Sequence, residues 1–120
     1  GLLTTLHYAD GLDNAKDKAF RAAYSAKHTI QPDVYAVQGY DAAQLLAAGL
    51  QAANGDIKNR DAVIKGMASA QLQSPRGDFT MSKAHNPVQD MYLRKVVGKE
   101  NQRMGVAIKA LGDTGRGCRM

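Results

Sequence analysis

The residues with the clearest potential for binding chemistry are Gln38, Tyr40 and Asp41, which follow the apolar run Val34–Val37. Tyr40 offers an aromatic ring with a hydroxyl group, and Gly39 allows a ligand to approach the backbone closely. A helix beginning at Asp41 would present a positive dipole end that favours a carboxylate. The alternative is that Tyr40 only packs and Asp41 only caps the helix, and the residues alone leave both interpretations open.

The other reactive residue types show no pattern typical of catalysis or metal binding. His7, His28 and His85 lie far apart and lack HExxH or HxH spacing, which favours solvated or core-edge histidines. Cys118 stands alone in a Gly/Arg-rich tail and cannot close an internal disulfide. No serine has a GxSxG setting, and no titratable pair suits acid–base chemistry. The sequence therefore predicts no enzyme, no metal and no cofactor.

The formal charge of +5 permits an anionic partner, so the distribution of the basic residues matters. Seven of the sixteen Lys and Arg residues follow Leu93, and Tyr92 is the one aromatic residue near them. That pattern predicts a solvated strand edge and tail and argues against nucleic-acid binding. No apolar run approaches the roughly 20 residues of a membrane span. Gly1 replaces an initiator methionine, which suggests that the chain was cut from a longer one.

The first half of the sequence has the pattern of a doubly wound α/β unit. Leu2–Leu6 predicts a short strand, and Asp13 is a suitable N-cap for an alanine-rich helix. Val34–Val37 is a continuous apolar run, which predicts a strand buried on both faces of a parallel sheet. A second helix would then run from Asp41 to the stop signal at Asn54-Gly55.

The second half has the pattern of a β-rich unit with short connections. Asn59 is a suitable cap for a third helix, and the turn at Ser74–Gly77 divides the chain. Alternating apolar residues then predict strands at Phe79–Met81 and Met104–Ile108, and the turn at residues 85–87 leads into a predicted strand at Val88–Val97. The predicted order is βαβαα followed by a β-rich segment. Two parallel strands cannot cover three helices, so we expect further strands from residues upstream.

Three segments resemble the C-terminal portion of periplasmic branched-chain amino acid-binding proteins, the type I two-lobed receptors of ABC importers. They are PDVYAVQGYDAAQLL at residues 32–46, SPRGDFTM at 74–81 and HNPVQDMYLR at 85–94. The likeness extends over nearly the whole chain, and the end at residues 118–120 is similar to the subgroup with aromatic-acid ligands.

This resemblance implies a periplasmic solute-binding component that closes about a hinge on a hydrophobic amino acid or an aromatic carboxylate and then docks on a membrane permease. Residues 1–81 would belong to the first lobe, residues 82–110 to the hinge crossing and the second lobe, and 111–120 to a mobile tail. Tyr40 would line the ligand cleft, with Gln38 and Asp41 as further candidates.

The upstream half of the family pattern is absent from this sequence. Without the upstream strands, one edge of the sheet would be unpaired. We therefore expect the chain to associate with a copy of itself through that edge. A sensor or regulatory module of the same fold is the alternative function.

Overall fold

A computed structural model describes residues 1–117, so Cys118 and the end of the predicted tail lie outside the described residues. The strands form one antiparallel sheet in the order β1-β4-β3-β2, with β5 also paired to β4. Their bounds are Leu3–Leu6 for β1, Gln71–Leu72 for β2, Phe79–Met81 for β3, Pro87–Val97 for β4 and Glu100–Leu111 for β5. β1 and β5 flank opposite edges of β4, because both pair with its residues 92–95.

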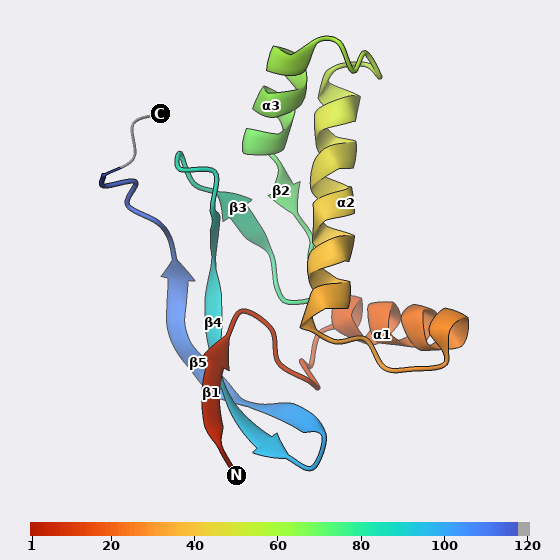
Figure 1. Ribbon diagram of the computed structural model, residues 1–120, viewed down its shortest axis with the longest axis vertical. Coiled ribbons are helices and arrows are strands. Elements are labelled where there is room, and N and C mark those ends of the chain that lie inside the picture. The colour runs from red at the N-terminus through yellow and green to blue at the C-terminus, as the bar shows by residue number, and fades with distance from the viewer. Residues whose placement is uncertain (118–120) are drawn as a thin grey trace.

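Within residues 1–117 three helices accompany the sheet: α1 (Ala15–His28), α2 (Val34–Ala52) and α3 (Arg60–Ala68). In Figure 1 the long helix α2 runs beside β2 and β3, α3 packs along its C-terminal half, and α1 crosses near its beginning. Asn59 caps α3 as the sequence predicted, with its side chain accepting a hydrogen bond from the Ala62 N–H. The cap of α1 is Asn14, one residue after the predicted Asp13. None of these helices is long and apolar enough to cross a membrane.

The predicted strand Val34–Val37 is wrong, because these residues form the first turn of α2. The Asp33 carboxylate accepts hydrogen bonds from the Tyr35 and Ala36 N–H groups, both at 3.0 Å, and so begins the helix eight residues before Asp41. A short apolar run fits a buried strand and a buried helical turn equally well. Here the N-cap at Asp33 favours the helix. Gly39 is consequently an interior helix residue.

The predicted parallel sheet is also wrong, since every strand pair among residues 1–117 is antiparallel. An isolated parallel bridge joins Asp10 to Gln102 outside the named strands. The three predicted strands of the second half are confirmed as β3, β4 and β5. Alternation at Phe79–Met81 and Met104–Ile108, and the turn that precedes Val88–Val97, identified them correctly.

The hydrophobic core lies where the loop after β1 meets α1, α2 and β4. Its buried members are Tyr8, Ala9, Leu12, Val37 and Tyr92. The Tyr8 hydroxyl donates to the buried Asp17 carboxylate at 2.8 Å, and so anchors the loop to α1. This core fixes the position of His7, the residue that directly precedes Tyr8.

Candidate functional site

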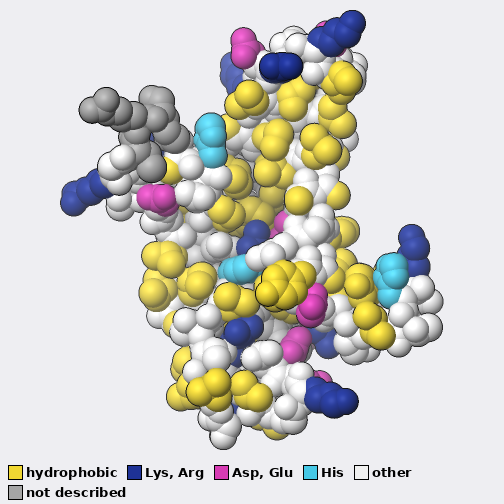
Figure 2. All heavy atoms as spheres, in the orientation of Figure 1, with side chains coloured by type: hydrophobic (Ala, Val, Ile, Leu, Met, Phe, Trp, Pro, Cys, Tyr) yellow, Lys and Arg dark blue, Asp and Glu magenta, His cyan; other side chains and the backbone are white. Residues whose placement is uncertain are grey.

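A groove of about 340 Å³ separates the N-terminal half of α2 from β2, β3 and the start of β4, a size within the range of small-molecule sites. Figure 2 shows histidine, basic and acidic side chains gathered near the middle of this face, next to hydrophobic side chains. The lining residues are His7, Gln38, Asp41, Ala42, Leu45, Leu72, Arg76, Phe79, Met81, Pro87 and Gln89. The groove therefore combines an apolar wall with several polar groups, as ligand sites commonly do.

Arg76 is the central polar residue of the groove. Its Nε lies 2.9 Å from the Asp41 Oδ2, a close ion pair in which the N–H is not aligned as in a hydrogen bond. Its Nη1 donates to the Gln89 Oε1, and its guanidinium lies 4.1 Å from the centre of the Phe79 ring. Arg76 thus ties α2 to β3 and β4 through charge, hydrogen bonding and a cation–π contact.

Asp41 is a buried partner of this arginine. Its Oδ2 accepts a hydrogen bond of 2.8 Å from the Ser74 hydroxyl, and its Oδ1 has no hydrogen-bond partner among the described residues. Burial raises the pKa of the Asp41 carboxyl, while the Ser74 hydroxyl and the Arg76 guanidinium oppose that rise. Burial also lowers the pKa of Arg76 against the effect of Asp41. Arginine keeps its proton in proteins, so the Arg76 guanidinium stays charged beside the groove, and the ionised Asp41 carboxylate offsets that charge from the side of α2.

His7 lies half-buried at the groove, with its Nε2 3.3 Å from the Gln38 Nε2. Burial and the positive charges of Arg76 and Arg94 lower its pKa to about 4, so the imidazole is neutral at pH 7. Arg94 is held nearby because it donates to the Thr4 hydroxyl and the Tyr8 carbonyl, at 3.1 and 3.2 Å.

The structure brings two of the three predicted site residues together. Gln38 and Asp41 line the groove one helical turn apart, whereas Tyr40 faces a different hollow between α1 and α2. The Tyr40 side chain is 45% exposed, and its ring centre lies 5.1 Å from that of Phe20. The helix N-terminus expected at Asp41 is instead at Asp33, whose own side chain occupies its N–H groups.

Sequence reasoning missed His7, Arg76 and Gln89. Arg76 lies in the predicted turn, and an arginine between Pro75 and Gly77 was the available signal. His7 and Gln38 are 31 residues apart, so their contact depends on tertiary packing. Among residues 1–117, no group of three or more His, Cys, Asp or Glu side chains could hold a metal ion.

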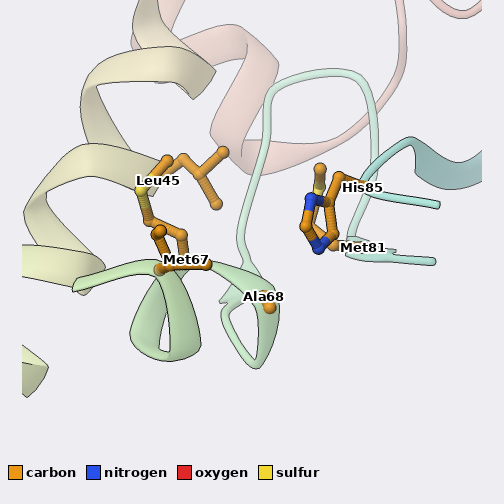
Figure 3. Close-up of a pocket in the computed structure, with 6 residues that line it drawn as sticks. Leu45, Met67, Ala68, Met81 and His85 are labelled. Carbon is orange, nitrogen blue, oxygen red and sulfur yellow. The ribbon is translucent and has the colours of Figure 1, made fainter. Parts of the chain in front are cut away.

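A second hollow, of about 250 Å³, lies between the two helices α2 and α3 and the end of β3. In Figure 3, Leu45 and Met67 come from the helices and face Met81 and His85 across an open space. Ile64 and Ala68 complete a lining that is mainly apolar.

Comparison with known proteins identifies the chain's relatives. The model of the periplasmic binding protein family matches residues 1–102. The chain belongs to the periplasmic binding protein family. This confirms the family and the type I fold that the resemblance implied. No curated protein sequence matches the chain.

Several solved periplasmic binding proteins are similar to it. A solute-binding protein of an ABC transporter from R. palustris, in complex with benzoate, is 47% identical with a TM-score of 0.95, over 100% of this chain and 33% of that one. A second solute-binding protein, from Rhodopseudomonas palustris BisB5 in complex with 3,4-dihydroxybenzoic acid, is 31% identical with a TM-score of 0.84. The match covers 96% of this chain and 32% of that one.

A leucine-binding protein from Thermotoga maritima MSB8 is 20% identical with a TM-score of 0.74, over 88% of this chain and 30% of that one, and indicates the fold alone. The chain therefore spans about a third of the length of the solved proteins that it matches.

Proposed function

We propose that this chain forms part of the solute-binding component of an ABC importer, and that the importer carries aromatic carboxylates. The observation that carries the proposal is 47% identity along the entire chain to a solute-binding protein bound to benzoate. Hydrophobic amino acids are the second ligand class, since the apolar wall of the groove would also suit their side chains.

The groove beside Arg76 supports a small carboxylate as the ligand. Leu45, Leu72 and Phe79 supply apolar surface for a ring, and the other lining residues include polar side chains for its acidic group. In this proposal Gln38 contacts the ligand directly, whereas Asp41 acts by positioning Arg76. The exposed ring of Tyr40 faces the hollow beside α1, so in this proposal it would meet the opposite lobe when the receptor closes.

The surface of the chain supports its being part of a larger receptor. Its accessible area is 8169 Å², whereas a compact protein of 12.9 kDa exposes roughly 6,300 Å². The excess exceeds the roughly 800 Å² that one partner buries in a standard interface. We propose that residues 1–81 and 82–110 belong to two lobes of that receptor, which closes about a hinge on its ligand.

This proposal implies a periplasmic location and docking of the closed receptor on a membrane permease. No covalent step is involved. A sensor module of the same fold is the alternative, and it would be joined to a signalling or DNA-binding domain in the product of the same gene.

Thermal unfolding of the full-length product of the encoding gene tests the function. Benzoate should raise the melting temperature in a concentration-dependent way, because a ligand that binds the folded state stabilises it. Gln38→Ala should weaken this shift, whereas Gln51→Ala, an exposed glutamine near the end of the same helix, should leave it unchanged. Stabilisation by leucine and not by benzoate would favour the second ligand class over aromatic carboxylates, and a product that neither compound stabilises would overturn the proposal.

A further inference from the structure

His7 occupies a junction between two hollows. It lines the groove beside Arg76 and also a smaller hollow of about 120 Å³ that continues along β4. Arg76 and Gln89 line both hollows as well. Together with Gln38, these side chains form a polar row, which we define as His7, Gln38, Arg76 and Gln89. The row comes from four separate parts of the chain, so the fold assembles it.

The polar row has hydrogen-bonding capacity to spare. The Gln38 Nε2 contacts one nitrogen of the His7 ring, and Arg76 donates to the carbonyl oxygen of the Gln89 side chain. The Nδ1 of His7 and the Nε2 of Gln89 have no hydrogen-bond partner among the described residues. Both can donate when the imidazole is neutral, with its proton on Nδ1. An acceptor-rich ligand fits such a row.

The charges around His7 favour an anion. Two cations face it, Arg76 from the turn before β3 and Arg94 from β4. The acidic groups near the row already have partners: Asp41 pairs with Arg76, Asp78 with Lys16 at 2.9 Å, and Asp90 with the Ala110 N–H at 2.9 Å. The remaining titratable neighbour is Tyr92. Its neutral hydroxyl group donates a hydrogen bond of 2.6 Å to the Arg76 carbonyl oxygen.

We infer that His7 is a specificity-determining residue of the groove, which donates a hydrogen bond to the acidic group of a small carboxylate and gains a proton when that ligand binds. The inference rests on the proposed function and names the side chain that recognises the ligand's negative charge. A carboxylate beside the imidazole favours the imidazolium form, so the pKa of His7 should rise from about 4 in the ligand complex. Gln38 would then turn its amide oxygen toward the ring.

Calorimetric titration of the full-length gene product with benzoate tests this inference. At pH 5.5, in two buffers of different ionisation enthalpy, native protein should take up a fraction of a proton per benzoate bound, and at pH 8 none. His7→Phe should raise Kd at least about tenfold, the usual cost of losing a hydrogen bond to a charged group. His7→Gln keeps a neutral donor, so it should bind nearly normally at pH 8 and take up no proton at pH 5.5.

His28→Gln is the matched control, since His28 is exposed at the end of α1 and away from the groove. It should leave both Kd and proton uptake unchanged. If native protein binds benzoate without proton uptake, or His7→Gln still takes up protons, the inference is wrong and the proposed function stands. If native protein binds no carboxylate at all, the proposed function fails, and the inference fails with it.

Discussion

The ion pair of Asp41 and Arg76 joins α2 to the turn before β3, and both side chains are less than a tenth exposed. Removing one partner of such a buried pair leaves an uncompensated charge, which costs about 3–5 kcal/mol. Asp41→Asn should therefore lower the free energy of unfolding by about that amount, as measured by urea denaturation. Asp78→Asn, which breaks an exposed pair with Lys16, should have little effect. Equal losses in the two variants would contradict a structural role for the buried pair.

The lowered pKa of His7 makes a separate prediction about stability. An unfolded histidine titrates near 6.5, and His7 in the folded chain near 4. Between these values the unfolded state binds more protons, so His7 should lower stability as the pH falls from 6.5 to 4. Partial solvent exposure limits the effect to about 1–2 kcal/mol. Urea unfolding of native protein and His7→Gln at pH 7 and pH 4.5 checks this, and parallel losses in both would contradict it.

At the residue scale the sequence singled out two residues that line the groove, and their role in ligand binding stays a prediction. Gln38 and Asp41 were chosen because they follow an expected strand at its junction with a helix. Tyr40 was assigned to the same site, because at such a junction all three residues could face one ligand. In a helix, Gln38 and Asp41 share a face, and Tyr40 points to another. The partners His7 and Gln89 could not be predicted, since their contacts join distant segments.

Two glycines of α2 play opposite roles in packing. A Cβ at Gly39 would meet nothing within 4 Å, whereas a Cβ at Gly49 would lie 2.7 Å from the Met67 Cγ and 2.8 Å from the Val63 carbonyl oxygen. Gly39→Ala should therefore stabilise the protein by about 0.5–1 kcal/mol through helix propensity. Gly49→Ala should destabilise it, because α3 must move away.

Thermal denaturation of the two variants measures the effect of the same substitution on stability at two positions of α2. A loss of stability in Gly39→Ala would contradict the placement of Gly39 within α2, and a gain in Gly49→Ala would contradict the close packing of α3.

At the element scale, periodicity predicted the strands of the second half and the helices better than it predicted the sheet. Apolar residues alternate in β3 and in the middle of β5, and turns bound β4, whereas the four residues Val34–Val37 carry no period long enough to separate strand from helix. The parallel sheet followed from that one error. Pairing between β1 and β4 joins residues about ninety positions apart, and local patterns carry no signal for it.

At the scale of the whole molecule, the chain is flatter and more open than a compact domain. Its radius of gyration is 16.0 Å, against about 14 Å expected for 120 residues. Exposed apolar side chains lie along β5, including Met104 at 58% and Ile108 at 51%. Within residues 1–117, β5 pairs with β4 along one edge, and beyond the bridge to Asp10 its other edge is open. An apolar edge of this length favours pairing with another strand.

The 120-residue chain expressed alone should therefore form dimers through β5, which light scattering at micromolar concentration can detect. Ile108→Lys should shift the chain toward the monomer, because a charge on an edge strand opposes pairing. Ile57→Lys changes an equally apolar, exposed residue between α2 and α3, and should leave the dimer intact. A stable monomer would contradict self-association. Dissociation in both variants would place the contact on a general apolar surface and not on the edge of β5.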